Sequence, residues 1–117
     1  ADAAYSVKLA DNGSVFACGG TKSSNFPTTT GVVKPNYGGG DADGWLASLT
    51  NSGSTMLAAT YLGTNEYDQC FFVDIDEEGN LITVGQTEGN YTVTAGVYSN
   101  NNSGQFLHKL NSTLTNT

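Results

Sequence analysis

Apolar and polar residues alternate along the first twenty or so residues of the chain. In "DAAYSVKLADNGSVFACGGT", Asp2–Thr21, the apolar side chains of Tyr5, Val7 and Leu9 recur at every second position, and the alternation resumes after Gly13. A period of two is typical of a β-strand with one buried face, and a glycine between two such runs indicates a tight turn. This stretch therefore predicts a β-hairpin.

The same pattern returns 66 positions further along the chain, from Asp2 to Asp68. The segment "DQCFFVDIDEEGNLITVGQT" aligns with the first hairpin without a gap, and its matched positions are Tyr5 with Phe71, Val7 with Val73, Leu9 with Ile75, Gly13 with Gly79, Val15 with Leu81, and Gly19 with Gly85. The match continues with small changes of register, first from "NFPTTTGV" to "NYTVTAGV" (Asn25 to Asn90) and then from Trp45 to Phe106. Self-similarity at such a period is the signature of a repeat architecture.

Each unit of the repeat predicts strand, turn, strand, long connection, strand, turn and strand. The expected strands lie near 4–10, 14–21, 44–50 and 55–62 in the first unit, and near 70–76, 80–87 and 105–110 in the second. The fourth strand of the second unit is expected at or beyond the end of the chain, because Met56 would match Thr117. The fold class is therefore all-β, with four-stranded antiparallel meanders of the kind that form β-propeller blades.

The two units divide the chain into a first blade, residues 1–65, and a second blade of three strands, residues 66–117. Two blades cannot close a ring, and each exposes apolar faces that only neighbouring blades can cover. We therefore expect about two blades of a larger propeller, whose remaining blades belong to the same longer chain. The alternative is that separate copies assemble into a ring through identical head-to-tail interfaces.

Several short motifs of the chain are similar to one family of propeller repeats. They are a hairpin turn of the form D-x-x-G-N and the segments Val84–Thr87 "VGQT", Phe26–Thr29 "FPTT" and Thr60–Gly63 "TYLG". Together they resemble the bacterial β-propeller repeat often called the SBBP repeat, although the second unit has Tyr91–Val93 "YTV" where "FPT" is expected. The resemblance implies a long, exported, multi-repeat surface protein of bacteria, found with adhesion or sorting domains. It implies no reaction.

Charge and hydropathy narrow the classes of partner. Eleven acidic residues face four lysines, giving a net charge of −7, which disfavours binding to the phosphates of nucleic acid. No apolar run approaches the ~18 residues that a membrane helix needs, so we expect no membrane insertion.

The segment Asp74-x-Asp76-x-Glu78-Gly79 loosely matches the start of a calcium-binding loop, in which carboxylates surround a glycine turn. The match fails at the twelfth position, where Gly85 replaces the required acid, and strands rather than helices are expected on both sides. In the first unit Lys8 and Ala10 stand in place of Asp74 and Asp76. What the two units share is the turn, so we interpret the segment as a hairpin turn.

Asp41 and Asp43 precede Trp45 and follow three glycines, a combination that can build a sugar or cation site. Glycine and aspartate are also ordinary turn residues, and Trp45 matches Phe106, so we interpret Trp45 as a core residue. His108 is the only histidine, and no serine or cysteine motif accompanies it. We expect no catalytic, cofactor-binding or metal-ligating residues in this chain.

Cys18 and Cys70 lie too far apart for a C-x-x-C motif and form either one disulfide or two buried thiols. Both sit in apolar strand patterns, where cysteine behaves as a small hydrophobic residue, which favours buried thiols.

The leading hypothesis is a structural or binding module of a secreted or cell-surface bacterial β-propeller, making protein or glycan contacts in adhesion or surface assembly. The long connection from Lys22 to Asp43 would supply contact area. One alternative is part of a glycan-processing propeller enzyme, and another is a small lectin that builds a propeller by oligomerisation.

Overall fold

The computed structural model describes all 117 residues and contains seven β-strands. They are β1 (Asp2–Leu9), β2 (Val15–Thr21), β3 (Asp43–Leu49), β4 (Met56–Leu62), β5 (Asp68–Ile75), β6 (Leu81–Thr87) and β7 (Gln105–Leu110). Every expected strand is present and begins and ends within about two residues of its predicted bounds. Helices are absent, and with them any helix of the length and apolar character needed to cross a bilayer.

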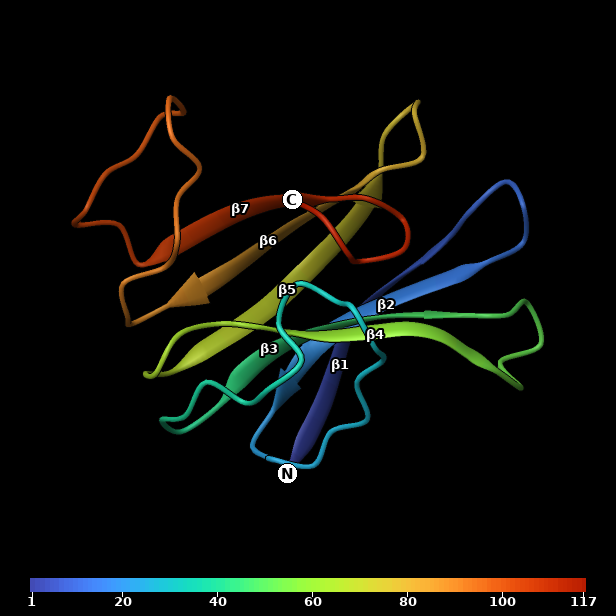
Figure 1. The fold of residues 1–117 in the computed structure, drawn as a ribbon, viewed down its shortest axis with the longest axis horizontal. Coiled ribbons are helices and arrows are strands. Elements are labelled where there is room, and N and C mark those ends of the chain that lie inside the picture. Colours follow the sequence, from blue (N-terminus) through green and yellow to red (C-terminus); the bar gives the residue numbers. More distant parts are fainter.

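The strands form two antiparallel sheets, neither of which closes on itself (Figure 1). The first sheet has the order β1-β2-β3-β4 and the second the order β5-β6-β7. Within each sheet every strand pairs with its neighbour in sequence, so the predicted all-β class and the meander order are confirmed. Strand β5 packs beside the first sheet, against β1, β2 and β3.

The repeat seen in the sequence is also a repeat of backbone geometry. The β1–β2 pair has an irregularity between Ala4 and Ser6, and the β5–β6 pair has one at the equivalent place, between Cys70 and Phe72. The two hairpin turns place Gly13 and Gly79 at φ values of 89° and 83°, which glycine adopts without steric cost. In both turns the glycine N–H donates to the carbonyl three residues earlier.

A third and a fourth turn match each other in the same way. In the turn after β3, the N–H of Thr50 donates to the carbonyl of Thr55 at 2.9 Å, and after β7 Asn111 donates to Asn116 at 3.0 Å. Gly53 has a φ of 72°, and Leu114 at the equivalent place has a φ of 60°. The repeat therefore extends through the turn that follows β7, with a fully buried leucine replacing the turn glycine.

Each sheet has two faces, which we name face A and face B. On face A the first sheet carries Val7, Leu9, Ala17, Trp45, Ala47 and Ala59, and the second carries Cys70, Val73, Ile75, Leu81, Thr83, Phe106 and Leu110. On face B the first sheet carries Phe16, Cys18, Leu46, Ala58 and Leu62, and the second carries Phe72, Ile82, Val84 and Leu107.

The main core lies where face B of the first sheet meets face A of the second. It contains Phe16, Cys18, Leu46, Ala58 and Leu62 from one side and Cys70, Val73, Leu81 and Leu110 from the other. A smaller core on face A of the first sheet joins Trp45, Ala47 and Ala59 and is covered by Phe26 from the β2–β3 connection. The stacking is therefore head to tail, with unlike faces in contact.

Candidate functional site

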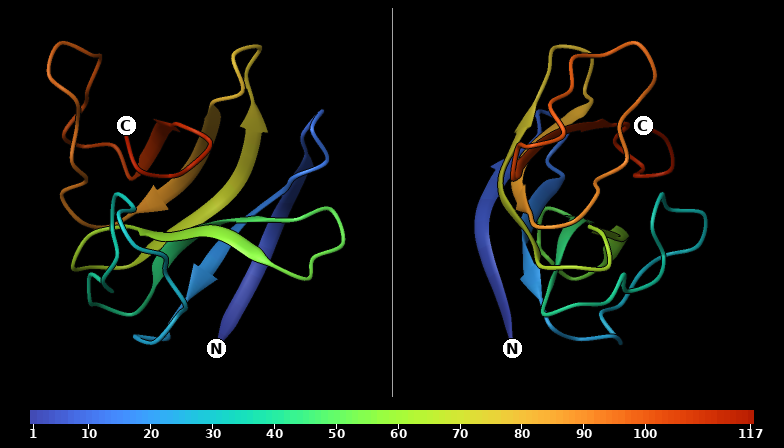
Figure 2. Two further views of the ribbon diagram at one scale, coloured as in Figure 1. Left: turned by 45° about the vertical axis from the view of Figure 1, so that its right-hand side comes forward. Right: turned by 90° about the vertical axis from the view of Figure 1, so that its left-hand side faces the viewer.

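Three connections gather at one end of the strands, because in a meander every second turn lies at the same end. They are the β2–β3 connection 22–42, the β4–β5 connection 63–67 and the β6–β7 connection 88–104. The N–H of Asp68 donates to Ala42 at 2.8 Å, and the N–H of Glu88 donates to Tyr67 at 2.9 Å. The two long connections lie on the side of the sheets away from β1 (Figure 2, right). We call this end of the molecule the loop end.

The loop end exposes several acidic side chains and one tyrosine. Its exposed residues include Asp41, Glu66, Glu88, Val97 and Tyr98, and Tyr98 is 90% accessible. Amphipathic aromatic side chains supply large contact area at low cost in conformational entropy. This surface has the composition of a contact site.

The glycine-rich part of the β2–β3 connection is fastened to the β4–β5 connection. A Cβ on Gly38 would lie 1.8 Å from the carbonyl oxygen of Thr64, and one on Gly40, whose φ is +66°, would lie 2.5 Å from that of Glu66. Only glycine permits so close an approach of two backbones. The stretch is therefore a packed part of the loop end.

Asp41 and Asp43, which the sequence suggested as a pair, have different environments. Asp41 is exposed, whereas Asp43 is fully buried and accepts a hydrogen bond from the N–H of Gly38 at 2.7 Å. Burial raises the pKa of Asp43 to about 6, although the Gly38 hydrogen bond and the nearby Lys34 act in the opposite direction. Oδ1 of Asp43 has no hydrogen-bond partner in the protein. Asp43 therefore fastens the connection rather than forming a shared carboxylate site.

Trp45 lies in the core, as its match with Phe106 predicts. Its indole N–H donates to the carbonyl of Ala3 at 3.1 Å, and its ring packs on Phe26 with centroids 5.3 Å apart. Tyr91 packs on Phe106 in the second unit with centroids 4.1 Å apart. The equivalent residues thus make equivalent contacts, and the ring of Trp45 is not free to stack on a sugar.

The segment Asp74-x-Asp76-x-Glu78-Gly79 forms the β5–β6 turn. Oδ1 of Asp76 accepts hydrogen bonds from the N–H groups of Glu78 and Asn80 at 2.9 and 2.8 Å, and Oδ2 accepts one from Nζ of Lys109 at 2.7 Å. These contacts, led by Lys109, lower the pKa of Asp76 to about 2. Asp74 points elsewhere and pairs with Lys8 at 3.0 Å. The carboxylates of this segment are thus divided between a turn and two ion pairs.

His108 forms two hydrogen bonds with hydroxyl groups. Its Nδ1 lies 2.8 Å from the hydroxyl of Tyr91, and its Nε2 lies 2.9 Å from Oγ1 of Thr117. Burial lowers the pKa of His108. The imidazole therefore favours the neutral form and ties the β6–β7 connection to the sheet.

Cys18 and Cys70 meet across the main core. Both are free, both are fully buried, and Sγ of Cys18 lies 3.6 Å from the carbonyl oxygen of Cys70. The neighbouring Cys18 and burial raise the pKa of the Cys70 thiol. The pair thus occupies the position of buried thiols, as the strand pattern predicts.

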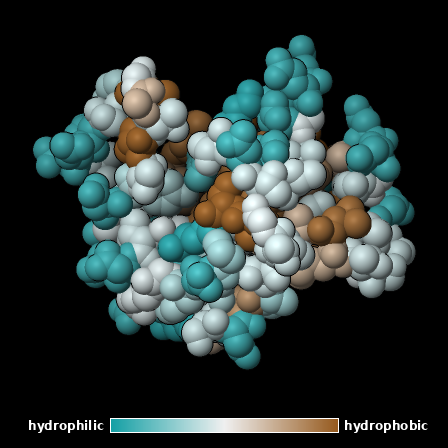
Figure 3. Space-filling model, in the orientation of Figure 1, coloured by the Kyte–Doolittle hydropathy of each residue, from teal (hydrophilic) through white to brown (hydrophobic).

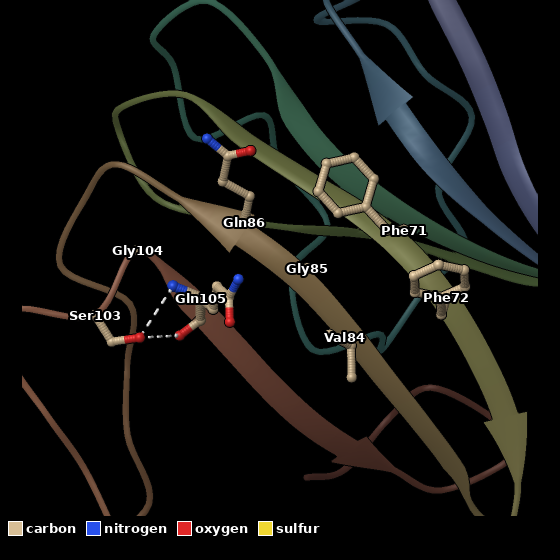
Figure 4. A pocket seen from close by; sticks show the side chains of 8 residues that line it. All are labelled: Phe71, Phe72, Val84, Gly85, Gln86, Ser103, Gly104 and Gln105. Carbon is tan, nitrogen blue, oxygen red and sulfur yellow. Dashed lines mark hydrogen bonds between the residues drawn. The ribbon is translucent and has the colours of Figure 1, made fainter.

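The sequence reasoning missed a second exposed surface, on face B of the second sheet. Phe72, Val84 and Leu107 are direct cross-strand neighbours on β5, β6 and β7, and all three are exposed. Phe72 and Val84 border a shallow depression of about 420 Å³ (Figure 4), lined by Phe71, Phe72, Val84, Gly85, Gln86, Ser103, Gly104 and Gln105. The signal in the sequence was that these face B positions are apolar on three consecutive strands.

The turns at the ends of the hairpins are more hydrophilic than the sheet faces. In the space-filling view they form hydrophilic tips, while hydrophobic atoms gather where the two sheets meet (Figure 3). The apolar side chains exposed on the sheets, which include Val7 and Leu9 on face A of the first sheet, therefore contrast with these tips.

No protein-family model matches the chain, and no curated protein matches it. The candidate surfaces consequently rest on geometry and chemistry alone.

Proposed function

We propose that the chain supplies two consecutive blades of a larger, exported bacterial β-propeller of the SBBP type, and that it works as a structural and binding module. The observation that carries the proposal is the head-to-tail stacking of two equivalent meanders, face B of one on face A of the next. Radial repetition of such a contact is how propeller blades are arranged. The remaining blades of the same chain are its first partners.

The loop end is the proposed contact surface for a protein or glycan partner. Its three connections are joined by backbone hydrogen bonds, so a ligand would meet a preorganised surface. The exposed Tyr98 suits stacking on a sugar or packing on a protein. The exposed acidic residues of the loop end and the net charge of −7 favour hydroxyl-rich or basic surfaces over anionic ones. Such contacts serve adhesion or surface assembly.

A glycan array combined with hydrolase assays tests this function. We expect binding without turnover, and a Tyr98→Ala variant should lose at least about tenfold in affinity because aromatic anchors dominate such contacts. Glu77→Gln is the matched control, since Glu77 is exposed in the β5–β6 turn at the opposite end of the strands.

If the protein hydrolysed a glycan, the proposal of a binding module would be wrong and the alternative of an enzyme would take its place. Loss of binding in Glu77→Gln but not in Tyr98→Ala would move the contact surface away from the loop end.

A further inference from the structure

The two sheets bury opposite faces and leave opposite faces exposed. Leu46 is fully buried on face B of the first sheet, whereas its equivalent Leu107 on the second sheet is 70% exposed. On face A the relation is reversed, since Val73 is 6% exposed and its equivalent Val7 is 68% exposed. One chain therefore carries both halves of the contact that joins its own two sheets, each half unpaired.

We propose that face B of the second sheet binds face A of the first sheet of a second copy of this chain, head to tail. Inside the chain, face B of the first sheet packs on face A of the second. In the new contact the second sheet of one copy takes the place of the first sheet, and the first sheet of the other copy takes the place of the second. The inference rests on the blade packing of the proposed function and gives the second copy the faces that further blades of a longer chain would otherwise cover. It is independent of any ligand at the loop end.

Charge complementarity supports this occupant. Inside the chain Lys8 of the first unit pairs with Asp74 of the second at 3.0 Å. Asp74 stands at the position equivalent to Lys8, so between copies the same geometry sets Asp74 opposite the second copy's Lys8. The two residues still carry opposite charges, so lysines and aspartates would alternate from sheet to sheet along the assembled copies.

Aromatic contacts are conserved by the same exchange. Tyr5 and Phe71 are equivalent residues, and their rings touch inside the chain with centroids 5.5 Å apart. Between copies Phe71 would face the second copy's Tyr5, which is again an aromatic pair. Tyr5 is half exposed, so its ring is accessible for that contact.

Side-chain volumes are also complementary. Inside the chain Gln69 packs so closely on Gly20 that a Cβ there would lie 1.7 Å from its Oε1. Gln86 is equivalent to Gly20, and Ala3 is equivalent to Gln69, so between copies Gln86 would pack on the second copy's Ala3. A large residue again packs on a small one, although the large residue is now on the other sheet.

The two core cysteines have equivalents of the same kind. Between copies Val84 stands in the place of Cys18 and the second copy's Ala4 in the place of Cys70, which gives an apolar pair of a larger and a smaller residue.

The test measures self-association of the 117-residue chain by sedimentation equilibrium or light scattering over a range of concentrations. The wild-type mass should rise with concentration from 12.2 kDa to its multiples, because a head-to-tail contact leaves free faces at both ends. Val7→Arg should block one face and Leu107→Glu the other, each weakening self-association at least about tenfold. Leu57→Glu is the control, because Leu57 is a half-exposed leucine of β4 beside the 112–115 turn.

Mixing the two blocked variants gives the decisive measurement. Each retains the face that the other lacks, so an equimolar mixture should form one species of twice 12.2 kDa and none larger. A wild-type chain that stays at 12.2 kDa at every concentration, or a mixture that does so, would overturn the proposal. So would an equal loss of association in Leu57→Glu. Circular dichroism of each variant checks that it is folded, and glycan binding by Val7→Arg reports on the loop end separately.

Discussion

The ring of Tyr91 stacks on the ring of Phe106, with centroids 4.1 Å apart and planes 7° from parallel. The two residues come from the β6–β7 connection and from β7, and the hydroxyl of Tyr91 also meets Nδ1 of His108. Phe26 and Trp45 make the equivalent contact in the first unit. One aromatic pair per unit thus holds each long connection against face A of its own sheet.

Removing the ring of Tyr91 should destabilise the protein. We expect Tyr91→Ala to cost about 2–3 kcal/mol, through lost burial and lost stacking, and Tyr91→Phe to cost about 1 kcal/mol, because only the hydrogen bond to His108 is lost. Urea unfolding followed by circular dichroism measures both. Equal costs for the two variants would show that the hydroxyl, and not the stacked ring, holds the connection.

The two hairpin turns need glycine for the same reason. Gly13 and Gly79 have φ values of 89° and 83°, in the left-handed region that is costly for residues with a Cβ. Gly13→Ala and Gly79→Ala should each cost about 1 kcal/mol and lower the melting temperature by about 4–8 °C. Gly104→Ala serves as the control, because Gly104 has no positive φ and an added Cβ would meet only Thr87, at 3.4 Å. A larger cost for Gly104→Ala would contradict this account.

Strands and turns were predictable because they depend on local pattern. Period-two alternation defines β1 and β5, and the glycines between the runs define the turns. Comparing the two units also argued against a metal site, since Lys8 stands where Asp74 would be a ligand. In the structure those two residues form an ion pair with each other.

Burial was not predictable, because it depends on what packs against a strand. Val7 and Val73 occupy the same position of the same pattern, yet one is exposed and the other belongs to the main core. The burial of Asp43 could not be predicted from the sequence either. An aspartate after three glycines resembles an exposed turn, and only the contact of its connection with Thr64 and Glu66 encloses it.

Acid should weaken the β5–β6 turn through Asp76. Its folded-state pKa is depressed to about 2 from 3.8, so its stabilising effect is present above pH 4 and is lost as the pH falls through the folded-state value. Wild-type stability should therefore fall between about pH 4 and pH 2 more steeply than that of Asp76→Asn, which lacks this titration. Urea midpoints measured across that range test the prediction. Glu77→Gln, at an exposed acid of the same turn, is the control and should leave the pH dependence as in the wild type.

Calcium should leave the melting temperature unchanged. Both oxygens of Asp76 already accept hydrogen bonds, from two backbone N–H groups and from Lys109, and a cation would have to displace them. Thermal melts with added Ca²⁺ and with a chelator measure the effect. A fall of several degrees in chelator that Ca²⁺ reverses would show that the turn is a metal site after all.

Asp43 should make the protein less stable as the pH rises from about 4 to 6. Burial raises its folded-state pKa from 3.8 to about 6, so the folded protein binds this proton more tightly than the unfolded chain does, and deprotonation costs stability across that interval. Asp43→Asn removes the buried charge and keeps an oxygen to accept the Gly38 N–H, so it should gain about 1 kcal/mol at pH 7 and little at pH 4. Asp41→Asn, at the exposed neighbour, should change neither value. Urea unfolding at the two pH values gives the difference, and a variant that is less stable than wild type at pH 7 would mean that the Asp43 carboxylate is stabilised as an anion inside the loop end.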